Sequence, residues 1–377
     1  MTNRLRALHV YRTYFPDPPG GLQEAIRQIA LATQAQGVDS TIFTLSPHPE
    51  PSRLERPEGS VVRCRSWLAP ASCDLGGLDS CRTFRTLVRQ SDILVYHFPW
   101  PYADILHALG SCGKPSVMVY HSDIVRQRLL GMTYKPIMVH TLHSMAAIVA
   151  TSTTYAQTSP ILSLPTLRHK VRIIPLGIDE HSYPTSSDDS VFVRLQLHAT
   201  DPYFLFVGVL RYYKGLHSLI RAAKDVNGKV VIAGTGPEQE RLENLVKDAA
   251  VNNVIFAGRV TNTEKIALLR HCRAVVQPSH LRAEAFGMTL VEAAMFARPM
   301  ISCEIGTGTS LVNKHAESGL VVPPEHPFEL AQAMNCLLQE TLFAKKLGNG
   351  ARARYEKFFS GPALGKAYAN LFAEMTR

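Results

Sequence analysis

The chain has 377 residues, of which 46% are apolar, and this is enough for two ordinary cores because single cores stop growing near about 250 residues. No apolar run approaches the ~18 residues that span a bilayer, and none of the seven cysteines form a Cys-x-x-Cys pair, which argues against a membrane-spanning protein, a disulfide framework or a zinc knuckle. Because the N-terminus also lacks a signal-type cleavage site, we expect a cytoplasmic protein. The net charge is +9, but the sequence has no RNA-binding aromatic platform and no helix-turn-helix pattern, so we expect phosphorylated substrates rather than nucleic acid.

Short β-rich apolar runs alternate with helical patterns in the first half of the chain. Strands are predicted at Ala7–Tyr11, Ser40–Leu45, Ile93–His97 and Ser116–Tyr120. Within 21–36, Leu22, Ile26 and Ile29 fall at helical spacing, and Gly37 supplies a stop. The first two strands and this helix therefore form a βαβ unit, which is typical of parallel sheets covered by helices.

The alternation pauses and then restarts in the second half. The strand 171–174 and Pro-Leu-Gly-Ile-Asp at 175–179 end the first half, and the polar segment 180–189 is typical of a linker. Further strands are predicted at Tyr203–Val207, Lys229–Ala233, Val254–Phe256, Ala274–Gln277 and Met300–Ser302. We expect an α/β protein with two Rossmann-like, doubly wound domains, 1–180 and 181–360, and an amphipathic helix in 361–377 that packs back toward the first domain.

The most specific local pattern is Glu284-Ala-Phe-Gly-Met-Thr-Leu-Val-Glu292, which opens a helix. Carboxylates at this spacing on one helix lie about 12 Å apart, whereas a retaining glycosidase needs its pair about 5 Å apart, so they suit two separate polyols. The backbone N–H groups of Gly287, Met288 and Thr289 can hold an anion at the helix N-terminus. The alternative is that Glu284 is a helix-terminal charge and Glu292 a surface residue.

A pair of cations follows the strand at 203–207. The segment Phe-Val-Gly-Val-Leu-Arg-Tyr-Tyr-Lys-Gly places Arg211 and Lys214 in the loop after that strand. Without a metal, a departing nucleoside diphosphate needs positive groups to neutralise the charge that develops on its oxygens, and Arg and Lys can supply them. A solvated basic loop is the alternative.

Three weaker patterns also follow predicted strands. Gly20 and Gly21 allow close approach of a phosphate or a sugar acceptor to the backbone, or else form a simple turn. His121 in Tyr-His-Ser-Asp is placed to contact the donor sugar, although a lone histidine is more often structural. The small residues 306–310, Gly-Thr-Gly-Thr-Ser, suit a phosphate nest or an ordinary turn.

Two patterns argue against bound cofactors. Gly-Thr-Gly-Pro-Glu at 234–238 follows a strand, but Gln239 replaces the third glycine of a dinucleotide fingerprint, so we interpret it as a tight strand-to-helix turn. No Asp-x-Asp pair follows a strand to hold a divalent ion against a diphosphate. We therefore expect no cofactor and no metal in catalysis.

In chain order, Gly-Gly after the first strand, Pro-Leu-Gly-Ile-Asp, Val-Gly…Lys-Gly, Gly-Thr-Gly-Pro-Glu, Phe-Ala-Gly-Arg-Val and Glu-x7-Glu resemble glycosyltransferase family 4. The resemblance covers nearly the whole chain and is strongest over 171–330. It implies the GT-B fold, in which two Rossmann-like domains face each other across a cleft, the first binding the acceptor and the second the nucleotide sugar. It also implies retention of anomeric configuration without a protein nucleophile, so no catalytic base is assigned.

The same resemblance implies roles for individual residues. Glu284 would bind hydroxyls of the donor sugar and Glu292 the ribose, while Arg211 and Lys214 would bind the diphosphate. The remaining residues assigned to catalysis or donor binding are His121, Gly20, Gly21, Arg259, Val260, Lys265, Phe286, Gly287, Met288 and Thr289. One departure is that Val209 occupies the position where the family more often has its arginine.

The segments Gly-Val-Leu-Arg-Tyr-Tyr-Lys-Gly and Glu-Ile-Gly-Thr-Gly-Thr-Ser resemble the sequences of bacterial enzymes that add mannose or rhamnose to lipopolysaccharide O-antigen. This implies GDP-mannose or GDP-rhamnose as donor, a lipid-linked saccharide as acceptor, and work at the cytoplasmic face of the inner membrane. Arg82, Arg85 and Arg89 share one helical face, which suits peripheral contact with an anionic membrane or an ordinary solvated helix. A UDP-sugar transferase, an epimerase and a non-catalytic sugar-nucleotide-binding protein stay open as alternatives.

Overall fold

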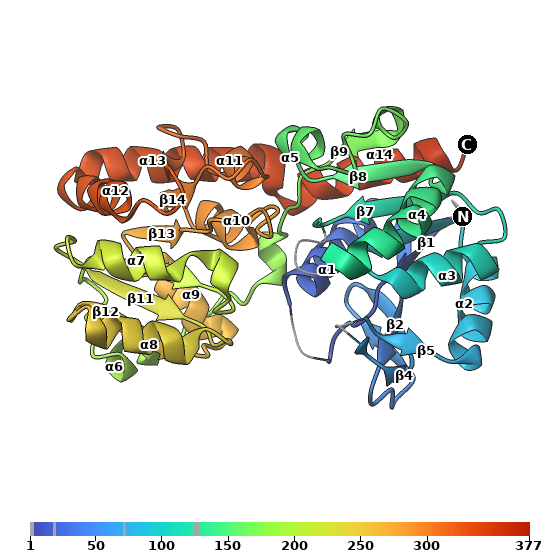
Figure 1. Ribbon diagram of the computed structural model, residues 1–377, viewed down its shortest axis with the longest axis horizontal. Helices are drawn as coiled ribbons and strands as arrows, with labels where there is room; N and C mark the ends of the chain where they lie inside the picture. The colour runs from blue at the N-terminus through green and yellow to red at the C-terminus, as the bar shows by residue number, and fades with distance from the viewer. Residues whose placement is uncertain (1–3, 18–19, 71–72, 124–127) are drawn as a thin grey trace. The chain divides into compact units, whose positions relative to one another are not determined.

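The computed structural model describes residues 4–17, 20–70, 73–123 and 128–377, and the chain divides into two compact units (Figure 1). Unit 1 comprises Met1–Asp179 together with Gly361–Arg377, and unit 2 comprises Glu180–Ser360. Each contains a sheet of mainly parallel strands accompanied by helices, which confirms the predicted α/β class with two doubly wound domains. Within the described ranges, no helix combines the length and apolar character needed to cross a bilayer.

The sheet of unit 1 has the strand order β3-β4-β2-β1-β6-β7-β8-β9, with β5 paired to β4. Its strands are β1 (Leu5–Val10), β2 (Val38–Ser46), β3 (Arg53–Arg56), β4 (Gly59–Leu68), β5 (Leu75–Gly76), β6 (Ile93–Phe98), β7 (Ser116–Tyr120), β8 (Ala147–Ala150) and β9 (Val171–Ile173). The pairs are parallel except that β3 and β5 run antiparallel to β4. Because the chain goes from β1 to β2 on one side and later returns to β6 on the other, the ends of β1 and β6 form the topological switch point.

Helices accompany these strands in the expected alternation. They are α1 (Gly21–Gln34), α2 (Leu78–Gln90), α3 (Pro101–Gly110), α4 (Arg128–Ser144), α5 (Thr153–Thr158) and, from the far end of the chain, α14 (Gly361–Met375). In α1, Ile26 and Ile29 are fully buried, as their helical spacing predicts. Gly37 adopts a left-handed φ of 84° just after this helix, which is the stop that the sequence indicates.

Unit 2 has an all-parallel sheet in the order β12-β11-β10-β13-β14-β15. Its strands are β10 (Tyr203–Val207), β11 (Lys229–Ala233), β12 (Val254–Gly258), β13 (Ala274–Gln277), β14 (Met300–Cys303) and β15 (Gly319–Val322). The predicted bounds of β10, β11 and β13 are those observed. Here the switch point lies between the neighbouring strands β10 and β13, where an open α/β sheet places its ligands.

The helices of unit 2 are α6 (Ser190–Arg194), α7 (Leu216–Ala223), α8 (Gln239–Asp248), α9 (Asn262–His271), α10 (Met288–Met295), α11 (Thr309–Val312), α12 (Pro327–Gln339) and α13 (Thr341–Arg354). Of these, α7, α8, α12 and α13 form a continuous apolar core with the sheet. The turn between β11 and α8 contains Gly234, where a Cβ atom would lie 1.9 Å from the carbonyl oxygen of Gly208. This glycine therefore serves close backbone packing, as the interpretation of a tight turn requires.

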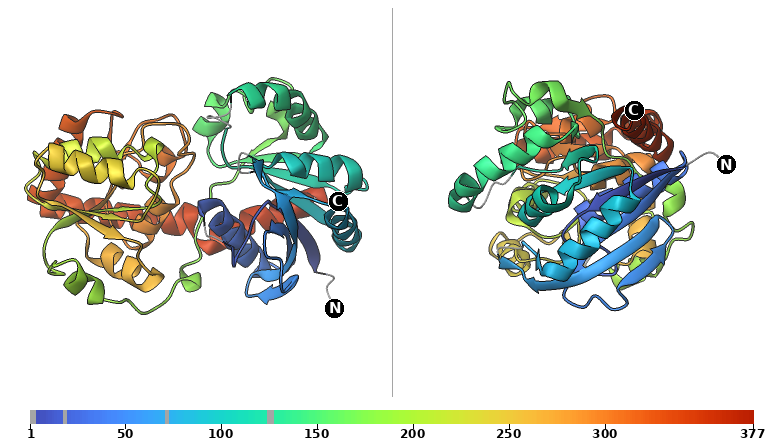
Figure 2. Two further views of the ribbon diagram at one scale, coloured as in Figure 1. Left: turned by 60° about the horizontal axis from the view of Figure 1, so that its bottom comes forward. Right: turned by 90° about the vertical axis from the view of Figure 1, so that its right-hand side faces the viewer.

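Helix α14 packs against α1 inside unit 1 (Figure 2). At Gly365 the two helices approach so closely that a Cβ atom would lie 2.2 Å from the carbonyl oxygen of Ala32. Alanine favours a helix over glycine by about 1 kcal/mol, but overpacking costs about 1–3 kcal/mol, so we expect Gly365→Ala to lower the free energy of unfolding by up to about 2 kcal/mol.

Urea unfolding followed by tryptophan fluorescence measures this effect, because both tryptophans, Trp67 and Trp100, lie in unit 1. Asn370→Ala, at an exposed position of the same helix, is the control and should leave the midpoint unchanged or raise it. A Gly365→Ala protein as stable as this control would contradict the close helix contact.

Candidate active site

Lys214 and Glu284 meet at the switch point of unit 2. Lys214 ends a short 3₁₀ turn after β10, and Glu284 lies in the loop between β13 and α10. Nζ of Lys214 donates a hydrogen bond to Oε2 of Glu284, and the side chains of Lys214 and Glu284 are only 12% and 10% exposed. Gly215 follows with a φ of 69°, and a Cβ atom there would lie 2.0 Å from the carbonyl oxygen of Pro278. A glycine is thus required for the two loops to approach.

The carboxylate of Glu284 is held by neutral donors as well as by the lysine. Its Oε2 accepts hydrogen bonds from Nε2 of Gln277 at 2.7 Å and from Oγ of Ser279 at 3.2 Å. Burial alone would lower the pKa of Lys214, but the attraction and hydrogen bond of the carboxylate outweigh it, so this pKa lies above its ordinary value. Lys214 is therefore a fixed positive charge at neutral pH.

Two further groups in this region offer positive potential to an anion. Arg211 is exposed on the same turn, and its charge acts against protonation of Lys214. Helix α10 begins after Gly287, which has a left-handed φ of 87°, and the N–H groups of Met288 and Thr289 have no acceptor within the helix. These donors and the helix dipole suit the oxygens of a phosphate.

Two of the residues assigned to donor binding use their side chains elsewhere. The ring of Phe286 is 3% exposed and packs edge-on against Phe359, with ring centroids 6.1 Å apart. The hydroxyl of Thr289 donates to the carbonyl oxygen of Val207 at 3.2 Å. Phe286 and Thr289 can therefore offer a ligand backbone groups, while their side chains fix the loop and the helix.

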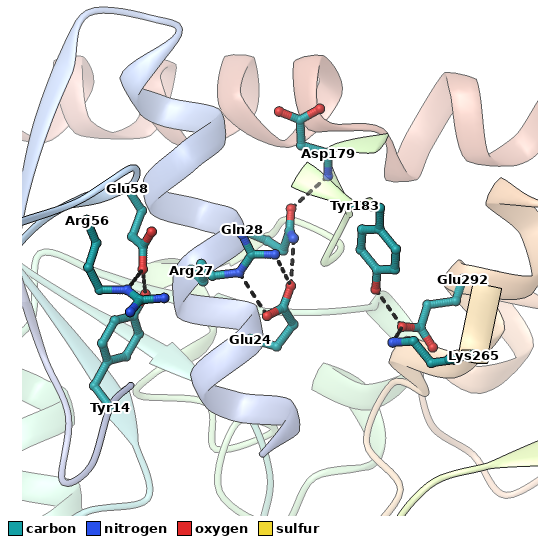
Figure 3. Close-up of polar contacts among 10 residues, drawn as sticks. All are labelled: Tyr14, Glu24, Arg27, Gln28, Arg56, Glu58, Asp179, Tyr183, Lys265 and Glu292. Atoms are coloured by element: carbon teal, nitrogen blue, oxygen red, sulfur yellow. Dashed lines mark hydrogen bonds and ion pairs between the residues drawn. The ribbon is translucent and has the colours of Figure 1, made fainter. Parts of the chain in front are cut away.

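A second buried carboxylate, Glu292, lies on α10 (Figure 3). Its Oε1 accepts hydrogen bonds from Nζ of Lys265 at 2.6 Å and from the hydroxyl of Tyr183 at 2.5 Å. The Lys265 ammonium also lies 5.1 Å from the centre of the Tyr183 ring. The interpretation of Glu292 as a surface residue is wrong, since it is only 7% exposed.

The sequence did not indicate Tyr183 as a site residue, because it lies in the polar segment 180–189, which is typical of a linker. Arg259 and Val260 form the loop from β12 toward α9, the helix that carries Lys265. Arg259 is exposed, and Val260 is half-buried. This loop therefore leads into the helix that carries Lys265.

The loop 306–310 does not form an open phosphate nest. The N–H of Gly306 and the hydroxyl of Ser310 donate to the two carboxylate oxygens of Glu304, at 2.9 and 2.6 Å. A carboxylate of the chain itself thus occupies these donors. The loop instead supports the neighbouring segment, because the N–H of Gly308 donates to the carbonyl oxygen of Ala285 at 2.8 Å.

In unit 1, His121 is the end of a row of polar side chains that crosses four neighbouring strands. Oγ of Ser40 lies 3.4 Å from Nε2 of His9, Nδ1 of His9 lies 3.1 Å from Nε2 of His97, and Nδ1 of His97 lies 2.9 Å from Nε2 of His121. These residues stand on β2, β1 and β6 and directly after β7, which are adjacent in the sheet. Burial lowers the pKa of His9 to about 4 and that of His121 to about 3, so the row is neutral at pH 7.

A neutral imidazole donates one hydrogen bond and accepts one, so the row has only two consistent arrangements of protons. In each, the proton on His97 determines which ring nitrogen of His121 carries its own. His9 and His97 are therefore positioning residues for His121, and the sequence analysis missed both. Their place near the carboxyl ends of two predicted strands was the available signal, but it becomes informative only once the strand order is known.

The other predictions in unit 1 concern glycines and arginines. Gly21 is exposed, and a Cβ atom there would meet nothing within 4 Å, whereas one at Gly20 would lie 2.6 Å from Oε1 of Gln23. On α2, Arg85 donates twice to the carbonyl oxygen of Leu109, at 3.1 and 2.8 Å. Gly21 thus offers an accessible backbone, while Arg85 holds the end of α3.

Comparison with known proteins agrees with this architecture. The family model "Glycosyl transferases group 1" matches residues 188–354, and "Glycosyl transferase 4-like domain" matches residues 20–177. D-rhamnosyltransferase WbpZ of Pseudomonas aeruginosa is 43% identical over 94% of this chain and 92% of its own length. O-antigen chain mannosyltransferase C of Escherichia coli is 38% identical over 98% of this chain and 99% of its own length.

Solved structures show the same fold at much lower identity. Sucrose-phosphate synthase from Thermosynechococcus elongatus covers 99% of both chains with a TM-score of 0.79 at 19% identity. HepE from Anabaena, solved with UDP and glucose, covers 98% of this chain and 100% of that chain with a TM-score of 0.79 at 18% identity. The relatives of high identity and coverage, together with this GT-B fold, show that the chain belongs to the glycosyltransferases of group 1 and is a hexosyltransferase.

Proposed function

We propose that the chain is a retaining glycosyltransferase of O-antigen assembly that transfers mannose or rhamnose from a GDP-sugar to a lipid-linked saccharide. The observation that carries the proposal is the buried pair of Lys214 and Glu284 at the switch point, in a chain 43% and 38% identical to a D-rhamnosyltransferase and an O-antigen mannosyltransferase over nearly its whole length. The pair offers one cation and one carboxylate side by side, which suits the two ends of a sugar diphosphate.

Each group has a separate task when the donor binds to unit 2. Lys214 and Arg211, with the N-terminus of α10, receive the negative charge that develops on the diphosphate as the glycosyl bond breaks. Glu284 accepts hydrogen bonds from sugar hydroxyls, and Glu292 binds the ribose, its carboxylate oriented by Lys265. The acceptor hydroxyl attacks from the face of the leaving group, and a phosphate oxygen takes its proton, so neither a catalytic base nor a metal is required.

The acceptor half of the proposal concerns unit 1. Gly21 offers an accessible backbone at the start of α1, and His121 offers a ring whose protonation the histidine row fixes. A lipid-linked acceptor would bring the enzyme to the cytoplasmic face of the inner membrane. Arg82 and Arg89 on α2 are the side chains that would face anionic lipid, since Arg85 binds the end of α3.

A thermal-shift screen with GDP, UDP, GDP-mannose and UDP-glucose tests the choice of donor, because a ligand that binds the native state raises the apparent stability with the logarithm of its concentration. We expect the GDP compounds to raise the melting temperature and the UDP compounds to have little effect, with and without EDTA. Glu292→Gln should weaken the shift from GDP-mannose. A shift from UDP-glucose alone would favour a UDP-sugar enzyme, and GDP binding without transfer to any lipid-linked saccharide would favour a binding protein.

A further inference from the structure

A cluster of metal-ligand side chains lies in unit 2, apart from the pair of Lys214 and Glu284. It consists of His217 on α7, His280 in the loop after β13, and Glu325 in the turn between β15 and α12. One ligand atom from each of the three lies within 4.8 Å of the others, and Nε2 of His217 lies 3.8 Å from Oε1 of Glu325. Tetrahedral zinc holds its ligand atoms about 3.4 Å apart, so small side-chain rotations would close the cluster around an ion.

Of the three side chains, His280 differs most from an ordinary core histidine. It is 8% exposed, and neither ring nitrogen has a hydrogen-bond partner among the residues that the structure describes. A buried polar group without a partner is costly, so native proteins rarely keep one without a ligand or a function. Its ring is fixed by edge-on contacts with Tyr212 and His217, at centroid distances of 4.9 and 5.1 Å.

The charges around the cluster are mixed. Burial lowers the pKa values of both histidines, which favours the neutral imidazole that binds metals. Arg221 and Arg241 face His217 and oppose a cation, whereas Glu325 attracts one, and Arg241 is paired with Glu238 at 3.2 Å. Two imidazoles and one carboxylate form the ligand set of a zinc site with three protein ligands, in which water takes the fourth position.

We propose that His217, His280 and Glu325 form a binding site for a zinc-type divalent ion, separate from the sugar-nucleotide site. A cavity of about 700 Å³, lined by His217, Glu325 and Tyr212 among others, leaves room for a water molecule on the open side of the ion. This ion has no part in the transfer step. Its role is to hold three segments together.

The proposed site would connect the loops that carry Lys214 and Glu284. His217 lies in the first turn of α7, three residues after Lys214, and His280 precedes Glu284 by four residues. The N–H of His280 already donates to the carbonyl oxygen of Tyr213 at 3.1 Å, so the two loops are in contact at this point. A bound ion would tie both loops to the turn that carries Glu325, and so would stabilise unit 2 without contacting the donor.

Metal titration of the tag-free, EDTA-treated full chain tests the proposal. We expect one equivalent of Co²⁺ to bind with the intense visible absorption of a tetrahedral site, to be displaced by Zn²⁺, and the melting temperature to rise with Zn²⁺ concentration. His280→Phe keeps a ring against Tyr212 but removes both ligand atoms, so it should abolish this absorption and melt no lower than the metal-free parent. Glu325→Gln, at an exposed position, should weaken binding without affecting folding.

His198→Ala is the matched control, because this histidine is exposed elsewhere in unit 2 and should leave metal binding unchanged. Equal binding to the parent, His280→Phe and Glu325→Gln would overturn the proposal, as would absence of a stoichiometric tetrahedral Co²⁺ spectrum in the parent. The shift in melting temperature caused by GDP is measured in the same proteins. Because that shift reports the donor site, failure of the metal site and failure of the proposed function are distinguishable.

Discussion

Replacing Lys214 by methionine should lower kcat by about 10²–10³-fold, the usual loss when one preorganised group is removed from a developing oxyanion. The methionine keeps the apolar stem in its buried position but leaves no charge opposite the departing diphosphate. Among the residues that the structure describes, Glu284 then retains Gln277 and Ser279 as side-chain donors. Because a buried carboxylate has lost its cation, we also expect the free energy of unfolding to fall by about 3–5 kcal/mol.

Steady-state transfer assays with the GDP-sugar, run well below the melting temperature, separate the two effects. Lys229→Met is the matched control, since Lys229 pairs with Asp201 at 3.1 Å on the surface and such pairs contribute less than about 1 kcal/mol. This control should keep its full kcat. If Lys214→Met keeps it too, the assignment of Lys214 to the diphosphate is wrong.

Acid should destabilise unit 1 strongly through the histidine row. Burial holds the pKa of His9 at about 4, that of His121 at about 3 and that of His97 well below its ordinary value, whereas each is near 6.5 in the unfolded chain. Between pH 6.5 and about 4 the unfolded chain therefore binds more protons than the folded one, so stability is full above this window and is lost as the pH falls through it. Three such groups give a slope of up to about 4 kcal/mol per pH unit.

Urea unfolding at pH 7, 6 and 5, followed by tryptophan fluorescence, measures this slope for unit 1. His9→Leu removes the histidine of the row that lies farthest from His121, and should reduce the slope by about 1.4 kcal/mol per pH unit. His169→Gln, at an exposed position in the same unit, should not change it. An unchanged slope in His9→Leu would mean that the row is not what titrates.

The alternation of strands and helices could be predicted where apolar runs are long. The observed bounds of β7, β10 and β11 are those predicted, because each of these strands is buried over nearly its whole length. The strands β3, β4, β5, β8 and β15 were not predicted. Of these, β3 and β5 are short edge elements, and β3 alternates exposed and half-buried residues and carries arginines at both ends. Burial on one side only leaves too weak a pattern in four residues to distinguish a strand from a loop.

The candidate site could be predicted as a set of residues but not as contacts. Glu284 and Lys214 stand seventy positions apart, and only the order of β10 and β13 in the sheet makes them neighbours. The row from Ser40 to His121 depends in the same way on four strands lying side by side. Tyr183 could not be found at all, because a polar segment between domains gives no sign of which buried carboxylate its hydroxyl will reach.

Unit 1 is built from both ends of the chain, because α14 packs on α1 and the whole of unit 2 is inserted between them. During synthesis the surface of α1 around Ala32 therefore stays uncovered until the ribosome has translated more than three hundred further residues. Unit 2 can form its core in that interval, while the N-terminal part of unit 1 is still without α14. A peptide fused to the C-terminus follows α14, which belongs to unit 1. It would consequently disturb the folding of unit 1 before that of unit 2, although unit 2 is its nearer neighbour in the sequence.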